Sequence, residues 1–365
     1  MSDDAGNPAG NDKGRPPNGR NGSDAVIRRP TQADVARAAG VSQTVVSHVL
    51  NGTQPKSMSQ ATRERVLEAM GELGYVPDQT AQSLRLRRTM TIAAVVPDIV
   101  NPFYGLFIRG VQDEARQFGY DLLAYNTDGH RDLELKALGV ALSGRVDGLV
   151  GTMFHLDDAD FAPLIRRGIP ISLLGGQISF DAYEEPLVDT ISVPDDSAAR
   201  MMVEHLIDRR HTRIAILAGE PGTPPRYNRE RGYRRALASH GIPIDEDLIR
   251  DCDFNERSGY EAMLGLLALD PRPTAVFASN DLIAIGALIA CRERGVQVPA
   301  EIAIGGFDDI PAAALVYPPL TTVSQRNQAI GHQLVRLLAD RLRGTYTGPV
   351  RTIENDFDLI VREST

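Results

Sequence analysis

The longest regular pattern in this chain starts at Thr91, where short apolar runs begin to alternate with helical stretches over about 275 residues. Each apolar run is bounded by turn or polar residues, as buried strands of a parallel sheet are. We therefore predict an α/β fold with parallel sheets and helices on both faces. Because this length exceeds one ordinary unit of the kind, we expect two similar lobes. Ligands of such sheets bind beyond the carboxyl ends of the strands, which here predicts a cleft between the lobes.

The predicted elements follow one another in a simple order. The strands are TIAAVVP, DLLAYN, GLVGTM, PISLL, RIAILAG, TAVFAS and EIAIGGF. Helical spacing fills the intervals between and after them. The predicted helices cover residues 103–118, 133–143, 197–209, 229–239, 259–269, 282–294 and 326–343.

Upstream of this pattern, residues 31–52 predict two short helices joined by a tight turn. Thr31 and Asp34 can form a capping box for the first helix, and Gly40 suits a turn with positive φ. Ser42 can cap the second helix. This layout is typical of a DNA-binding helix-turn-helix, although an αα-hairpin in a bundle has the same local pattern. The polar face of the second helix holds Gln43, Thr44, Ser47 and His48.

A third helix is predicted over residues 60–73, capped by Ser59 and ended by Gly74. Its apolar stripe holds Val66, Leu67, Met70 and Leu73. Three helices can close a small core around Val35, Val46, Val49, Val66 and Met70. The segment that follows, residues 78–84, is too short to be a stable helix alone in water, so we expect a linker that folds only on binding.

Charge is distributed unevenly along the chain. The whole chain has a net charge of −9, whereas residues 28–90 hold nine Lys and Arg residues against five Asp and Glu residues. A basic head on an acidic body is typical of a module that meets phosphates, joined to one that does not. Residues 1–28 are rich in Gly, Asn, Asp and Pro and predict a disordered tail.

The sequence favours a protein of the cytoplasm. The first residues have no apolar region of a secretory signal, and no run of 18 apolar residues could span a membrane. Cys252 and Cys291 are far apart and lack metal-binding spacing, which favours free thiols in a reducing compartment. We expect a soluble protein that lies at the nucleoid when it is bound to DNA.

Motifs of catalysis and of cofactor binding are missing. The sequence has no GxxxxGK[ST], no GxGxxG after a strand, no GxSxG, no HExxH and no cluster of His and Cys. Nothing assembles a nucleophile with a base. We therefore expect no enzyme activity, no cofactor and no metal. Adjacent acids are interpreted as solvated loops or helix caps: Asp157 with Asp158, Asp195 with Asp196, and Asp308 with Asp309.

Binding-type side chains follow several predicted strands. Phe103 and Tyr104 come after the first strand, where aromatic rings either stack on a sugar or base or pack the next helix. Asn280 and Asp308 end two later strands and are equally suited to helix capping. Arg229 lies in a polar loop that enters a helix. It could clamp a hydroxylated or anionic ligand, or form a weak surface ion pair.

Several of the motifs occur together in a fixed order: DVARAAGVSQTVVSHVLNG, ATRERVLEAMGELGYVPDQTAQSLR, VVPDIVNPFY, GRVDGLV, RRHTRIAILAG, RERGYRRAL, RPTAVFASNDLIAIGAL, and IGGFDDIPAA followed by PPLTTVSQ. In this order they resemble the LacI/GalR (lactose-repressor) family of bacterial transcriptional regulators, from residue 30 to about residue 362. The resemblance implies a helix-turn-helix head, a hinge helix, and a two-lobed core like that of periplasmic binding proteins. The implied parts are the head at 29–76, the hinge helix and linker at 77–90, lobe one at 91–191 and 326–352, and lobe two at 192–325 and 353–365.

The resemblance also implies the DNA contacts. Gln43, Thr44 and His48 match positions that contact base edges, while Ser42, Ser47 and Asn51 suit the DNA backbone. Position 48 is commonly Arg in the family, and His occurs there in the purine-repressor branch, so the operator sequence stays open. Val45 stands where a hydroxyl often meets phosphate.

Two hinge residues are implied in the same way. Leu84 matches the leucine that opens a central base step in the minor groove, and Ala81 matches the small residue that lets two hinge helices approach.

For the effector, the resemblance implies a set of residues that line the cleft: Asn101, Phe103, Tyr104, Arg229, Phe254, Asn280 and Asp308. Gly175 stands where many sugar-responsive members have Asp. Arg229 with Asp308 still fits a neutral polyhydroxylated ligand, because the pair offers a donor and an acceptor to hydroxyls.

The implied function is a DNA-binding transcriptional regulator, most often a repressor, controlled by a sugar or sugar derivative in the cleft. Without a leucine-heptad extension after residue 365, we expect a homodimer on a near-palindromic DNA operator. The alternatives are an activator, or a nucleoside- or purine-responsive regulator of the same fold. A solute-binding protein is disfavoured by the head and by the missing secretory signal, and a sugar-processing enzyme by the missing catalytic groups.

Overall fold

The computed structural model of this chain describes residues 29–50, 58–77, 83, 88–175 and 187–365. Contacts divide the chain into a small unit that ends at Gln79 and a large unit that starts at Thr80. The described part of the small unit is helical, and the large unit is an α/β structure with two sheets. The expected disordered tail, residues 1–28, lies outside the described residues. The expected hinge helix also lies outside them, apart from Ser83.

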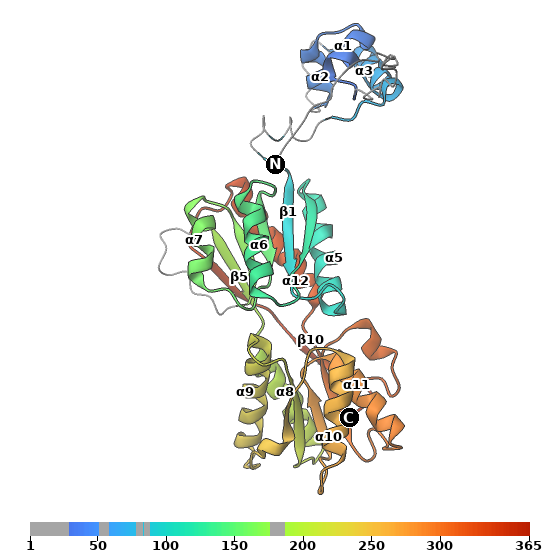
Figure 1. Cartoon of the computed structure of the whole chain (residues 1–365), viewed down its shortest axis with the longest axis vertical. Helices are drawn as coiled ribbons and strands as arrows, with labels where there is room; N and C mark the ends of the chain where they lie inside the picture. The colour runs from blue at the N-terminus through green and yellow to red at the C-terminus, as the bar shows by residue number, and fades with distance from the viewer. Residues whose placement is uncertain (1–28, 51–57, 78–82, 84–87, 176–186) are drawn as a thin grey trace, which may run out of the picture. The chain divides into compact units, whose positions relative to one another are not determined.

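The small unit contains three described helices: α1 (Gln32–Ala39), α2 (Gln43–Leu50) and α3 (Gln60–Leu73) (Figure 1). The predicted capping box is present, since the Thr31 side chain accepts the backbone N–H of Asp34 at 3.4 Å and Asp34 accepts that of Thr31 at 2.9 Å. Gly40 ends α1 with φ 64°, a left-handed conformation that glycine adopts without strain. The sequence therefore predicted both ends of this helix correctly.

The three helices enclose a small apolar core. Val35, Val46, Val49 and Val66 are buried in it, and Met70 packs against it, as predicted. Leu67 and Leu73 of the predicted apolar stripe are exposed instead. Ala36, Ala39 and Ala69 complete the core, because small side chains allow three short helices to approach closely.

The large unit has two six-stranded sheets, which confirms the predicted two-lobed α/β architecture. The strand orders are β11-β5-β4-β3-β1-β2 in lobe one and β12-β10-β9-β8-β6-β7 in lobe two. All pairings are parallel except that of β12 with β10. In lobe one the strands are β1 (Thr91–Val96), β2 (Asp121–Asn126), β3 (Gly148–Gly151), β4 (Ile171–Leu174), β5 (Val188–Ser192) and β11 (Arg351–Glu354). In lobe two they are β6 (Ile214–Gly219), β7 (Ile249–Asp251), β8 (Ala275–Ala278), β9 (Ala303–Asp308), β10 (Thr321–Ser324) and β12 (Asp358–Ile360).

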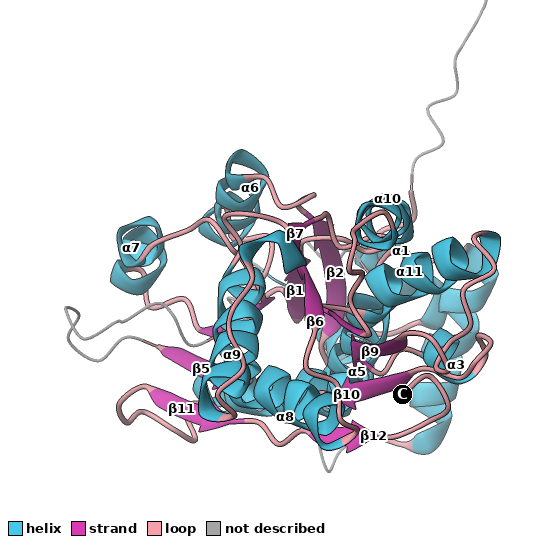
Figure 2. Cartoon of the chain, turned by 90° about the horizontal axis from the view of Figure 1, so that it is seen from below, coloured by secondary structure: helices cyan, strands magenta, loops and turns pink. Residues whose placement is uncertain are grey.

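Helices cover both faces of each sheet (Figure 2). In β1, Ile92 and Ala94 pack towards α5 and α12, while Ala93 and Val95 pack towards α6 and α7, as the two-residue period of a strand requires. The helices of lobe one are α5 (Pro102–Gln117), α6 (Arg131–Leu142), α7 (Asp158–Arg166) and α12 (Asn327–Arg343). Those of lobe two are α8 (Asp195–Asp208), α9 (Pro224–Ser239), α10 (Glu256–Leu267) and α11 (Asp281–Glu293), with short 3-10 turns η1 (Glu246–Leu248) and η2 (Pro311–Ala314).

The chain passes between the lobes three times: after Ser192, after Ser324 and after Glu354. The third boundary between the lobes was expected near residue 353; Ile353 pairs with Ile191 at the end of the first sheet, and the chain leaves this sheet after Glu354. One residue, Asn355, joins all three passages. The backbone N–H of Asn355 donates to Ser192 O at 2.8 Å, and its Nδ2 donates to Gln325 O at 2.8 Å.

None of the helices in the described ranges is long and apolar enough to cross a membrane.

Candidate functional site

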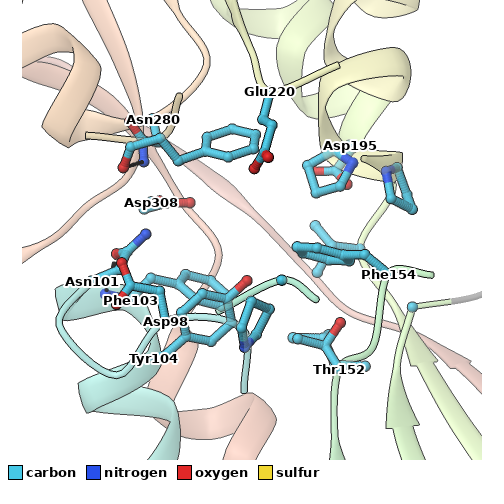
Figure 3. A pocket seen from close by; sticks show the side chains of 18 of the residues that line it. Asp98, Asn101, Phe103, Tyr104, Thr152, Phe154, Asp195, Glu220, Asn280 and Asp308 are labelled. Carbon is cyan, nitrogen blue, oxygen red and sulfur yellow. Dashed lines mark hydrogen bonds between the residues drawn. The ribbon is translucent and has the colours of Figure 1, made fainter. Parts of the chain in front are cut away.

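A pocket of about 410 Å³ lies between the two lobes of the large unit. It opens beyond the carboxyl ends of the parallel strands, where the sequence predicted a cleft. Side chains from both lobes face one another across it (Figure 3). The structure brings together in its lining all seven expected effector residues: Asn101, Phe103, Tyr104, Arg229, Phe254, Asn280 and Asp308.

The start of α5 forms one wall of the pocket. Asn101 caps this helix by accepting the backbone N–H of Phe103 at 3.0 Å. The rings of Phe103 and Tyr104 meet edge to face, with centroids 4.8 Å apart. Both rings also belong to the core beneath α5, so they pack the helix and line the pocket at once. Burial raises the pKa of Tyr104 far above its usual value, which keeps the phenol neutral.

Arg229 does not lie in a loop, as the sequence suggested, but within α9. The alternative of a surface ion pair was wrong too, because the side chain is only 7% exposed. Its Nε donates to Asp195 Oδ1 at 2.9 Å and its Nη1 donates to the carbonyl of Ser279. The guanidinium also lies over the Phe307 ring, 3.9 Å from the centroid. These contacts fix the cation in one orientation, with Nη2 3.9 Å from Asp308.

Asp308 ends β9 with φ 111°, an unusual conformation for a residue with a side chain. Its Oδ1 accepts Gln325 Nε2 at 2.6 Å, and its carbonyl accepts Asn327 Nδ2 at 3.0 Å. Burial raises the pKa of Asp308 to about 7, with a contribution from Asp195, although Arg229 and Gln325 act to lower it.

The interpretation of Asp195 and Asp308 as solvated acids was therefore wrong. Both are largely buried and both face Arg229. Burial also raises the pKa of Asp195, against the effect of Arg229. Asp157 does cap α7, by accepting the backbone N–H of Asp160 at 3.2 Å, as the same interpretation expected.

Asn280 acts as the predicted helix cap and also lines the pocket. Its Oδ1 accepts the backbone N–H of Ile283 at 2.8 Å, and its Nδ2 donates to Phe254 O at 3.3 Å. Phe254 packs against Gly219, where an added Cβ would lie 2.5 Å from the ring. Gly219 is thus required for this wall, since any side chain there would displace the aromatic ring.

The neighbouring Asp281 is buried and does not line the pocket. Its two carboxylate oxygens accept the Thr322 hydroxyl and, at 2.8 Å, the backbone N–H of Ile310.

Several lining residues escaped the sequence analysis: Asp98, Thr152, Phe154, Asp195, Glu220 and Gln325. Each of them lies within three residues after the end of a strand, and this position was the available signal. The loop that carries Phe154 is held by Glu134 of α6, which accepts the backbone N–H groups of Phe154 at 2.7 Å and His155 at 3.1 Å. Gly175 also lines the pocket, where the resemblance would place an acid.

In the small unit, α2 turns its apolar side to the core and a polar side outward. Val46 and Val49 are buried, while Ser42, Gln43 and Thr44 are exposed and Ser47 and His48 are half-buried. The Ser42 hydroxyl accepts the backbone N–H of Val45 at 3.4 Å and so begins the helix. The expected DNA-contact residues Asn51, Ala81 and Leu84 lie outside the described residues.

Comparisons with known proteins match both units. A family profile described as bacterial regulatory proteins, lacI family, matches residues 31–78, and one described as a periplasmic binding protein-like domain matches residues 203–365. The HTH-type transcriptional regulator DegA of Bacillus subtilis (strain 168) is 35% identical over 342 residues, which are 92% of this chain and 98% of DegA.

Two solved structures are similar over the same extent. A complex of the transcriptional regulator CelR with cellobiose has a TM-score of 0.68 and 36% identity, and the match covers 92% of this chain and 100% of that one. A lac repressor dimer bound to operator and the anti-inducer ONPF has a TM-score of 0.80 and 28% identity, over 92% of this chain and 99% of that one.

Proposed function

This chain belongs to the lacI family of bacterial regulatory proteins, and we propose that it is a repressor of transcription whose operator affinity is set by a small ligand in the interlobe pocket. The observation that carries the proposal is the convergence of seven expected side chains on one pocket of about 410 Å³. Pockets of this volume suit small organic ligands. The relatives are transcriptional regulators, and we expect no catalysis.

The DNA side of the proposal rests on α2. Its exposed Gln43 and Thr44, with half-buried His48 one turn on, form a face of hydrogen-bonding side chains that can enter a major groove. Ser42 and Ser47 would contact phosphates beside them, with Asn51. A homodimer would place two such helices on a near-palindromic operator, as in the related lac repressor dimer bound to operator. We expect the homodimer to bind its operator in the cytoplasm. The hinge residues Ala81 and Leu84 would then lie in the minor groove.

The ligand we propose is a saccharide. The related CelR binds cellobiose, and the pocket here combines aromatic rings with carboxylates, which suits a ring that carries hydroxyls. Arg229 and Asp308 are buried, and their side chains lie 3.9 Å apart, so the pair is already oriented. Arg229 would donate hydrogen bonds to hydroxyl groups of the ligand, and Asp308 would accept them. Tyr104, Phe154 and Phe254 would stack against the apolar faces of the rings.

The proposed control works through the relative arrangement of the lobes. A ligand can shift this arrangement only by binding one state more tightly than the other. Asp308 is hydrogen-bonded to Gln325 and Asn327, which lie at the second passage between the lobes. A ligand that contacts Asp308 would therefore act directly on the segment about which the lobes move.

A gel-shift experiment with the DNA upstream of the protein's own gene tests the proposal. We expect a specific shift that changes with one member of a panel of sugars and nucleosides, and that Gln43→Ala abolishes without unfolding the head. Ser143→Ala, in the large unit, is the matched control and should shift normally. Absence of any specific shift at low salt would refute the repressor. A shift that only a nucleoside changes would assign the ligand to that class, and an increase of transcription on binding would identify an activator.

A further inference from the structure

The pocket carries an excess of acidic groups. Within the part of the chain that the structure describes, Arg229 is the one cationic side chain in the lining, against six carboxyl groups. The cation is already engaged by Asp195, by the Ser279 carbonyl and by Asp308. The charge of Arg229 is therefore already shared with two carboxyl groups, while its Nη2 can still donate to a hydroxyl group of the ligand. The six acids are Asp98, Asp128, Asp195, Glu220, Asp253 and Asp308.

Four of these acids are exposed to the pocket: Asp98, Asp128, Glu220 and Asp253. None of the four forms an ion pair with the described residues. Asp98 and Asp128 follow β1 and β2 of lobe one. Glu220 and Asp253 follow β6 and β7 of lobe two, so the acids approach the pocket from both lobes. A carboxylate only accepts hydrogen bonds, so this lining offers many acceptors and few donors.

An independent observation, the Tyr104 side chain, points to a polar ligand. Tyr104 is only 9% exposed and lines the pocket, yet its hydroxyl has no hydrogen-bond partner among the described residues. Figure 3 shows this side chain facing the side chains of the other lobe. Because the Tyr104 ring is buried while its hydroxyl opens to the pocket, a bound ligand can hydrogen-bond to this hydroxyl without displacing a protein partner.

We infer that the pocket selects saccharides by charge, binding those with a protonated amine most tightly, neutral ones next, and phosphorylated or carboxylated ones least. Hydroxyl and ammonium groups supply the donors that the carboxylates lack, whereas a phosphate would face like charges in a partly desolvated site. The inference rests on the proposed function, because it specifies the ligand of the same pocket. It also implies that the regulator responds to a sugar before any phosphorylating reaction has acted on it.

Titration calorimetry with three probes built on the same β-1,4-linked disaccharide backbone tests this order of affinities. The probes are the disaccharide of two β-1,4-linked glucosamines, cellobiose, and cellobiose 6-phosphate. We expect the phosphate to bind at least about tenfold more weakly than cellobiose, and the amine at least about threefold more tightly. The differences should shrink as the salt concentration rises, since salt screens exposed charges.

Two variants test whether the carboxylates that line the pocket cause this order of affinities. Glu220→Gln and Asp253→Asn each remove one exposed charge without changing shape, and each should narrow the ratio between cellobiose and its phosphate by about twofold to threefold. Glu261→Gln on α10 is the matched control. Glu261 is exposed and does not line the pocket, so this variant should leave the ratio unchanged.

The inference is overturned if cellobiose 6-phosphate binds as tightly as cellobiose or more tightly. It is also overturned if Glu220→Gln and Asp253→Asn both leave the ratio of the two affinities unchanged. Binding of none of the three probes, by protein that still shifts its operator, also overturns it while the regulator role stands. The reverse result, in which the order holds but no DNA is shifted, would refute the proposed repressor and leave the charge selection intact.

Discussion

Asp308 combines three unusual properties: a positive φ, a buried carboxyl group and a raised pKa. Its position directly after a strand was enough to predict that it lies at the pocket. Its raised pKa was not predictable, because it depends on burial and on Arg229 and Asp195, which are distant in sequence and come together only in the folded lobe. The same holds for Arg229, whose polar surroundings in the sequence suggested a loop although it lies buried within α9.

Asp308→Asn should raise the stability of the large unit in a pH-dependent way. The pKa of Asp308 is about 7 in the folded state, against a usual value of 3.8 for an aspartate. The folded state therefore binds more protons between these pH values, so stability is lost as pH rises through them. Asparagine avoids this cost. The stability of the variant relative to the wild type should grow from pH 4 to pH 7, by on the order of 3 kcal/mol, and then level off. Thermal unfolding followed by circular dichroism measures it, and a difference that stays constant with pH would contradict the raised pKa.

At the scale of elements, the sequence predicted those strands that are uniformly apolar and those helices with a clear stripe. It missed β5, whose sequence VDTIS has a buried acid at its second position. Asp189 lies there between Arg341 and Arg351, at 2.8 Å and 2.7 Å. It also missed α7 and the short strands β7, β10, β11 and β12, whose edges and neighbours are set by tertiary pairing rather than by their own pattern.

Asp189→Asn should destabilise the large unit strongly. Burial alone would raise the pKa of Asp189, but hydrogen bonds from Arg341 and Arg351 outweigh it and hold the pKa below its usual value. The Asp189 and Arg341 side chains are both 0% exposed, so the variant leaves a buried cation without its counterion. We expect a loss of about 3 to 5 kcal/mol at pH 7, measured from urea unfolding curves.

Asp340→Asn provides the comparison for that prediction. Asp340 also pairs with Arg351, at 2.8 Å, but it is partly exposed. Its replacement should cost less than about 1 kcal/mol. Equal losses in the two variants would show that burial of the Asp189 pair does not determine its contribution.

At the scale of the whole large unit, the alternation of strands and helices predicted two lobes, and the family resemblance implied boundaries between them near residues 192, 325 and 353. The contacts that join the passages were not predictable. Asn355 contacts Ser192 and Gln325, which are far away along the chain, and nothing in the local sequence marks it.

Asn355→Leu should loosen all three passages without disturbing the sheets. The variant keeps the backbone N–H but removes the donor to Gln325 O and to Asp356 O. The carbonyl of the buried Gln325 and that of the exposed Asp356 lose this partner, so we expect a loss of about 1 to 2 kcal/mol. Hydrogen exchange measured by mass spectrometry should accelerate in peptides that span 190–194 and 322–328, and stay unchanged in β1 and β8. Asp356→Asn, at the exposed neighbouring residue, should change neither region, and unaltered exchange in Asn355→Leu would rule out the joining role.

The meeting of three chain passages at one residue, Asn355, has a mechanical consequence. Lobes connected at three separated points could slide or shear, but lobes connected at one point can mainly turn about it. The pocket lies beside this pivot, because Gln325 belongs to both. A ligand that displaced Asp308 by a fraction of an ångström would therefore act on a short lever arm and would produce a larger displacement at the surfaces of the lobes farthest from the pocket.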